Sequence, residues 1–125
     1  MKTEILNARI VKPTISMADH GCLTFGLFLN GGSWAVMFGG YSIGHGYLGA
    51  DKFSAKYGDG LEAMMRIMDT VGVDRWEDLK DKYIRAEVPT GSGSVYKIGN
   101  LIEDKWFDIK EFFETKSKEH KNEAP

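Results

Sequence analysis

The chain has 125 residues, 42% of them hydrophobic and 12% aromatic, which is enough to build the core of one domain. Sixteen basic and eighteen acidic residues give a net charge of −2, which argues against general nucleic-acid binding because such proteins carry a basic excess. Cys22 is the single cysteine, so an internal disulfide is excluded and a reducing compartment is favoured. The sequence shows neither a signal peptide nor an apolar run long enough to span a membrane, and we expect a cytoplasmic protein.

The N-terminal third predicts three strands. Residues 4–15 form the first, and Pro13 marks its end or a sheet edge. Residues 22–29 form the second, because apolar residues recur there at every second position. Residues 30–32 predict a type I′ hairpin turn, and residues 33–38 form the returning strand. The apolar face of the second strand consists of Leu23, Phe25, Leu27 and Leu29.

Residues 39–60 contain seven glycines, which predicts a long surface loop with at most one short strand. Long loops in compact domains are often functional. Aromatic side chains here could stack on a base or on a partner protein, or could simply cover the sheet. The candidate binding residues of this loop are Tyr41, His45, Tyr47, Phe53 and Tyr57.

The second half predicts a helix over residues 60–71, a short helix from Asp74, strands over residues 82–88 and 94–102, and a helix from Asp108. The apolar stripe of the first helix is expected to be Leu61, Met64, Met65, Met68 and Val71. The methionines Met64, Met65 and Met68 could instead form an adaptable partner surface, although a core position fits their spacing better. Asp59 is its expected N-cap and Gly72 its expected C-terminal glycine. The apolar face of the last strand is expected to be Tyr96, Ile98 and Ile102.

The C-terminal helix has a recognisable start. Asp108 and Glu111 have the spacing of a capping box, and Phe107 with Phe112 has that of a hydrophobic staple. The order is therefore β-β-β-α-α-β-β-α, which predicts an α+β domain whose mainly antiparallel sheet comes from two hairpin regions packed with two to three short helices. Residues 1–116 would form this single domain, and residues 117–125 would be a frayed polar tail.

Candidate catalytic groups are few. His20 and Cys22 share a strand face and could form a nucleophilic pair, although a turn histidine followed by a packed cysteine explains them better. We therefore expect no catalytic residue, no metal site and no cofactor.

Anion binding and partner binding remain open for two further residues. Arg85 lies on a predicted strand among aromatic residues and could hold an anionic ligand with its guanidinium group. Trp106 could be a binding knob, or it could dock the last helix on the sheet.

Seven short motifs resemble a recurrent family of small phage and prophage proteins, over nearly the whole chain. They are Asp19-His20-Gly21-Cys22-Leu23-Thr24, Phe38-Gly39-Gly40-Tyr41, Thr70-Val71-Gly72-Val73, Trp76-Glu77-Asp78-Leu79-Lys80, Lys82-Tyr83-Ile84-Arg85, Ile98-Gly99-Asn100-Leu101-Ile102 and Asp104-Lys105-Trp106-Phe107. The resemblance implies a phage origin, and small accessory phage proteins commonly block host defence. It carries over no functional residue.

Three functions follow from this resemblance and the residues. The first is a non-enzymatic anti-defence protein that binds a host defence protein such as a CRISPR effector, which predicts an exposed aromatic or methionine patch within residues 39–60. The second is a sponge that sequesters an anionic nucleotide signal in a pocket lined by Arg85 and a loop aromatic. The third is a small enzyme that uses His20, Cys22 or His45. A homo-oligomer is compatible with all three.

Overall fold

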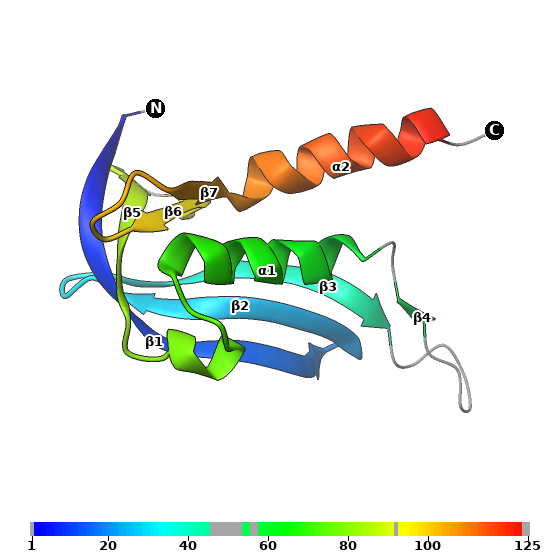
Figure 1. The fold of residues 1–125 in the computed structure, drawn as a ribbon, viewed down its shortest axis with the longest axis horizontal. Coiled ribbons are helices and arrows are strands. Elements are labelled where there is room, and N and C mark those ends of the chain that lie inside the picture. The colour runs from blue at the N-terminus through cyan, green and yellow to red at the C-terminus, as the bar shows by residue number, and fades with distance from the viewer. Residues whose placement is uncertain (1, 46–53, 56–57, 92, 124–125) are drawn as a thin grey trace.

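The computed structural model describes residues 2–45, 54–55, 58–91 and 93–123 (Figure 1). Within these ranges, seven antiparallel strands form one sheet in the order β4-β3-β2-β1-β5-β6-β7, with two α-helices and one 3₁₀ helix packed on it. The α+β class and the antiparallel sheet are thus confirmed. The elements are β1 (Thr3–Asp19), β2 (Cys22–Asn30), β3 (Ala35–His45), β4 (Ser54–Ala55), α1 (Asp59–Val71), η1 (Trp76–Leu79), β5 (Tyr83–Pro89), β6 (Lys97–Asn100), β7 (Trp106–Asp108) and α2 (Ile109–Glu123).

Strand β1 joins the two halves of the sheet and is longer than expected. Its first half pairs with β5 from Thr3 to Arg9, and most of its length from Arg9 onward pairs with β2. Figure 1 shows β1 bending sharply between these halves. Pro13 lies in the half that β5 does not reach, where one side of the strand is an edge. This confirms the predicted edge position and explains why the strand continues past a residue without an N–H.

The β2–β3 hairpin lies where the sequence placed it, but its turn differs. Asn30 pairs with Ala35, and the Gly31 N–H donates to the Trp34 carbonyl at 2.8 Å, so the loop has four residues. Of the two glycines only Gly32 has a positive φ, +95°. The predicted type I′ turn, which needs positive φ at two successive residues, is therefore wrong.

Strand β3 runs on to His45, through the first seven residues of the expected loop. Gly39 and Gly40 have φ of +97° and +82°, and the register with β2 shifts beside them, between Phe25 and Gly26. A side chain at Gly39 would meet the Gly26 Cα at 3.1 Å. These glycines form a bulge within a strand. In the sequence, the glycines of a bulge cannot be distinguished from those of a loop.

Helix α1 covers the inner face of the sheet but is rotated from the predicted orientation. Met64 is buried as expected, yet Leu61 and Met65 are exposed, and the other buried positions are Gly60, Ala63, Ile67 and Thr70. A Cβ at Gly60 would lie 2.9 Å from Ile43 Cγ1, so small residues allow α1 to approach the sheet closely. The predicted stripe was right for Met64 and in part for Met68 and Val71, which pack partly buried against the core, and it was wrong for the exposed Leu61 and Met65.

The ends of α1 agree with prediction only in part. Gly72 is the C-cap with φ of +92°, and its N–H donates to the Met68 carbonyl, as expected. The N-cap is Gly58 rather than Asp59, which is instead the first helical residue. The Asp59 carboxylate contacts His120 of α2.

Strand β6 is shorter than predicted because Asn100 ends it. The Asn100 side-chain oxygen accepts hydrogen bonds from the N–H groups of Ile102 and Glu103, which turns the chain back into the unpredicted strand β7. Ile98 is buried as expected, whereas Ile102 lies in this turn and is 87% exposed. Tyr96 precedes the strand and is also exposed. The predicted common face for these three residues was wrong.

Helix α2 starts as predicted and ends later. The Glu111 N–H donates to the Asp108 carboxylate at 2.9 Å, and the Phe107 and Phe112 rings pack with centroids 5.5 Å apart. The helix continues to Glu123, through residues that the sequence assigned to a frayed tail. None of the helices in the described ranges is long and apolar enough to cross a membrane.

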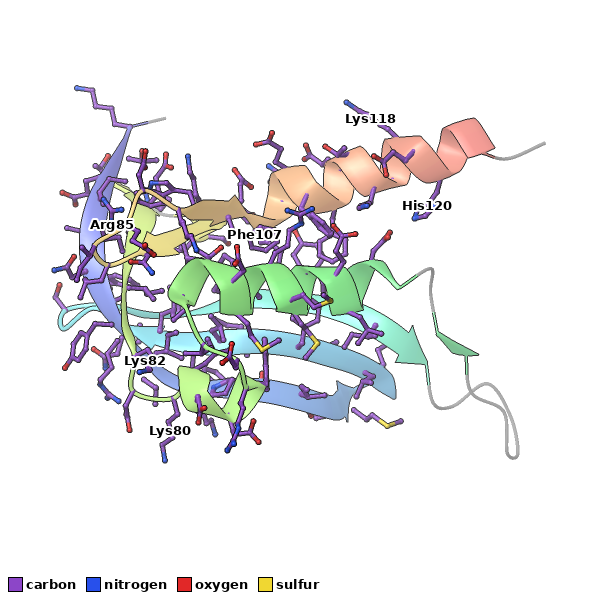
Figure 2. The ribbon with its side chains drawn as sticks, viewed as in Figure 1. Lys80, Lys82, Arg85, Phe107, Lys118 and His120 are labelled. Carbon is purple, nitrogen blue, oxygen red and sulfur yellow. The ribbon has the colours of Figure 1, made fainter. Side chains whose placement is uncertain are left out.

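A contact between the two helices accounts for this extra length. His120 Nε2 lies 2.7 Å from Asp59 Oδ2 at the start of α1, and Figure 2 shows His120 and Lys118 on opposite sides of α2. We expect His120→Ala to accelerate amide hydrogen exchange at residues 117–120 about fivefold, because a hydrogen bond of about 1 kcal/mol is lost. Lys118→Ala is the matched control and should leave exchange slow. Equal exchange in both variants would show that the pair does not hold the helix end.

Candidate functional site

Three of the candidate residues from residues 39–60, Tyr47, Phe53 and Tyr57, lie outside the described residues. His45 is the last residue of β3. The structure describes the side-chain contacts of the candidates Tyr41, Arg85 and Trp106. The structure brings Arg85 and Trp106 together and places Tyr41 elsewhere, on β3.

Tyr41 attaches α2 to the sheet. Its ring stacks on Phe113 of α2, with centroids 4.2 Å apart and an interplanar angle of 16°. Burial is the main reason that the pKa of the Tyr41 hydroxyl is raised above its usual value, and nearby Tyr96 and acidic side chains add to the shift. This packing agrees with the alternative in which Tyr41 covers the sheet.

Arg85 stabilises the turn between β6 and β7. Its Nε donates to the Asn100 carbonyl at 2.7 Å, and its Nη2 donates to the Glu103 carbonyl at 2.8 Å. The guanidinium carbon lies 4.5 Å from the centroid of the Trp106 ring. Trp106 in turn lies flat over Gly99, where an added Cβ would be 2.5 Å from the ring. Two hydrogen bonds and a stacked face thus give Arg85 a structural role, which leaves less of the guanidinium group for an anion.

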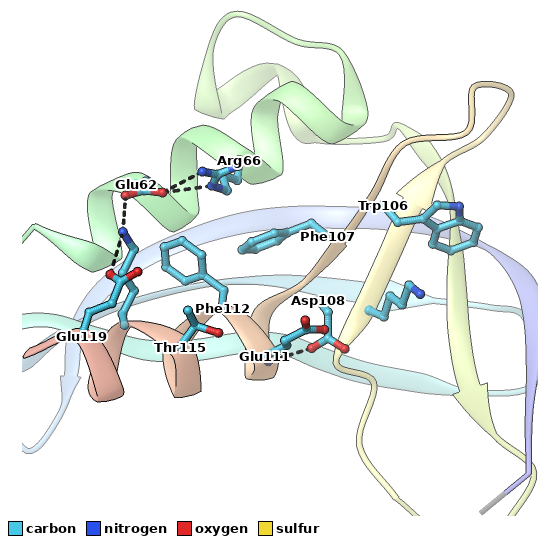
Figure 3. Close-up of a pocket in the computed structure, with 11 residues that line it drawn as sticks. Glu62, Arg66, Trp106, Phe107, Asp108, Glu111, Phe112, Thr115 and Glu119 are labelled. Carbon is cyan, nitrogen blue, oxygen red and sulfur yellow. Dashed lines mark hydrogen bonds and ion pairs between the residues drawn. The ribbon is translucent and has the colours of Figure 1, made fainter. Parts of the chain in front are cut away.

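A cleft of about 470 Å³ lies between α1, α2 and β7, beside Trp106 (Figure 3). Its charged lining residues are Glu62, Arg66, Lys97, Asp108, Glu111, Lys116 and Glu119. Hydrogen bonds from Lys116 and Arg66 lower the pKa of Glu62, and the same contact with Glu62 raises the pKa of Lys116. Because four carboxylates accompany three cationic groups, the cleft offers no excess positive charge to a nucleotide.

The proposed nucleophilic pair lies at a hairpin. His20 and Gly21 form the β1–β2 turn with φ of +52° and +76°, and Cys22 begins β2 in a half-buried position. This agrees with the reading of His20 as a turn residue. No group of three or more His, Cys, Asp or Glu side chains suited to a metal ion occurs among the described residues.

The most distinctive surface is an apolar strip on α1, which we call the α1 flank and define as Leu61, Met65 and Met68. Leu61 is 55% exposed and Met65 is 64% exposed, although both are large apolar residues one helical turn apart. Met68 continues the strip and is partly buried against the core. An adaptable partner surface was one interpretation of Met64, Met65 and Met68 in the sequence, but a core position was favoured for all three, and the structure buries Met64 and leaves Met65 exposed.

The α1 flank lies on the side of α1 opposite α2. On the α2 side, Glu62 pairs with Lys116 at 3.1 Å, and the Arg66 guanidinium lies 5.9 Å from the Phe112 ring centroid. On a helical wheel, Leu61 and Met65 project away from those contacts. Figure 1 shows η1 and the far half of β1 on that other side of α1.

Further apolar groups lie beside this side of α1. Ile15 of β1 pairs with the buried Phe25, so it lies on the helix-covered face of the sheet. The Ile15 side chain is nevertheless 48% exposed. Trp76 of η1 packs edge-on against Phe25, with ring centroids 6.4 Å apart. The buried Trp76 indole N–H has no hydrogen-bond partner within the part of the chain that the structure describes.

No family model, no curated protein and no solved structure matches this chain. An exposed strip of leucine and flexible, polarizable methionine side chains is suited to binding another protein.

Proposed function

We propose that this protein is a non-enzymatic anti-defence protein of phage origin that binds a host defence protein through the α1 flank. The observation that carries the proposal is the exposure of Leu61 and Met65 on one side of α1. The phage origin rests on the resemblance of the short sequence motifs. A CRISPR effector is one example of the class of partner.

The chemistry of the surface supports protein binding over ligand binding. Methionine side chains adapt to irregular partners, and apolar groups at the centre of an interface contribute most of the binding free energy. The cleft beside Trp106 carries balanced charges, and Arg85 is engaged with backbone carbonyls. Neither feature favours a nucleotide over a protein surface.

The double variant Leu61→Glu and Met65→Glu should lose anti-defence activity. Two carboxylates buried at an interface would weaken binding by about 100-fold or more, because each must be desolvated without a partner. The measurement is the plaquing efficiency of a targeted phage on cells that carry an active defence system and express the variant. Wild-type protein should restore plaquing, and the double variant should not.

Ile102→Glu is the matched control, since Ile102 is 87% exposed in the β6–β7 turn and lies outside the α1 flank. This variant should protect the phage as well as wild type does, at equal expression and thermal stability. If the flank variant still protects the phage, the proposed surface is wrong. Release of a small anion of defined mass in native mass spectrometry would instead favour nucleotide sequestration.

A further inference from the structure

The far half of β1 presents a free sheet edge. Pairing of β1 with β5 ends at Arg9. On the same side of the strand, the Ile10 N–H donates to the Lys82 carbonyl, and the Ile10 carbonyl accepts from the Asp81 N–H. From Val11 to Asp19, β2 is the only strand that pairs with β1 in the described ranges. Figure 1 shows this half of β1 as the lower border of the sheet. Its outward backbone groups can therefore accept another strand, except at Pro13, which has no N–H to donate.

The free segment has one apolar face and one polar face. Pro13 pairs with Leu27 and Ile15 pairs with Phe25, which places both on the helix-covered inner face. Thr14 pairs with Gly26, and Ser16 pairs with Thr24, on the outer face. Met17 lies two residues after Ile15, where the register irregularity between Ser16 and Asp19 begins. Ile15 and Met17 are 48% and 38% exposed, so the apolar face of the edge is incompletely covered.

We propose that this edge binds the same edge of a second copy of the chain, and that the two β1 strands pair antiparallel about a two-fold axis at Ile15. A two-fold axis perpendicular to the sheet keeps the inner face of both copies on the same side. Inner-face residues of one copy must therefore pair with inner-face residues of the other, and outer-face residues with outer-face residues. Centring on Ile15 pairs Ile15 with itself and Pro13 with Met17. It also pairs Thr14 with Ser16. Between Pro13 and Met17 every apolar residue then faces an apolar one, and every hydroxyl faces a hydroxyl. Beyond these residues the same register pairs Lys12 with Ala18 and Val11 with Asp19.

The sequence around the segment favours a closed dimer over open aggregation. Register irregularities occur at Ile10 to Lys12 and at Ser16 to Asp19, so they bracket the segment and limit the length that can pair. The Lys12 side chain lies over the Phe28 ring at 5.4 Å, on the outer face. Because the pairing is symmetric, one contact uses the far half of β1 in both copies, so this segment cannot bind a third copy.

The dimer would join two seven-stranded sheets into one and place both α1 flanks on the same side of it. This self-association is separate from the binding of a host protein, and either one can fail without the other.

Charge placement at Thr14 and Ser16 tests the dimer and its register together. Thr14→Lys with Ser16→Lys places lysine opposite lysine twice, and this variant should be monomeric. Thr14→Lys with Ser16→Glu places lysine opposite glutamate twice and should be dimeric. The dissociation constants, measured by sedimentation velocity, should differ by at least about tenfold. Neither Gly26 nor Thr24, the β2 neighbours, carries a charge, so both variants keep similar intrachain contacts.

Ile15→Cys gives a second readout. In the proposed register the two introduced thiols lie within disulfide reach, and mild oxidation should give a covalent dimer on a non-reducing gel. Wild-type protein, which contains Cys22, should not cross-link under the same conditions. A wild-type protein that is monomeric at all concentrations would overturn the proposal, as would equal dissociation constants for the two double variants.

Discussion

Replacing Phe25 by alanine is expected to destabilise the protein by about 3–5 kcal/mol, the usual cost of deleting a buried aromatic ring. Phe25 is 1% exposed and lies on the inner face of β2, where its ring contacts Trp76. The cavity would open at the centre of the core, between the sheet and η1. Urea unfolding followed by tryptophan fluorescence measures the loss directly.

Phe28→Ala is the matched control on the same strand. Phe28 lies on the outer face, is 38% exposed and has Lys12 over its ring, so its loss should cost only about 1 kcal/mol. If the two variants unfold at the same urea concentration, the assignment of inner and outer faces to β2 is wrong.

Replacing Gly99 by valine is expected to cost about 1–3 kcal/mol through overpacking. A Cβ at this position would lie 2.5 Å from the Trp106 ring, so the indole would have to leave the surface of β6. It would then lose its contact with the Arg85 guanidinium, which holds the carbonyls of the β6–β7 turn. Thermal unfolding by circular dichroism measures the change.

Gly91→Val controls for the loss of glycine flexibility. An added Cβ at Gly91 meets nothing within 4 Å, and φ there is not positive, so unfolding should be nearly unchanged. A Gly99 variant as stable as the Gly91 variant would show that the Trp106 ring does not need the bare backbone beneath it.

Local chemistry made parts of the fold predictable. The alternation in β2 identified Phe25, Leu27 and Leu29 as core residues, and all three are buried. The spacing of Asp108 and Glu111 located the start of α2, where the expected hydrogen bond is present. In both cases the signal and the structure depend on residues within a few positions of each other.

The features that could not be predicted from the sequence depend on contacts between distant elements or on segments too short to show a pattern. Gly39 and Gly40 suggested a loop, because composition alone does not distinguish a glycine bulge from a turn. The rotation of α1 depends on the close approach of Gly60 to Ile43, a contact between distant elements. Strand β7 has three residues, too few for a periodic pattern.

The candidate site shows the same division. The sequence indicated Arg85 and Trp106 as two separate binding candidates, and the structure brings them together around backbone carbonyls of the β6–β7 turn. It identified Leu61 and Met65 as apolar residues of α1 and favoured a core position for both. Only the packing of Ala63 and Ile67 against the sheet shows that these two side chains are left outside.

We propose that the α1 flank binds a host defence protein, and a titration tests this directly. Wild-type protein, the Leu61→Glu and Met65→Glu variant and Ile102→Glu are each titrated against a purified defence complex chosen by the plaquing assay. We expect equal affinity for wild type and Ile102→Glu, and a loss of about 100-fold or more for the flank variant. Equal affinity for all three proteins would contradict it.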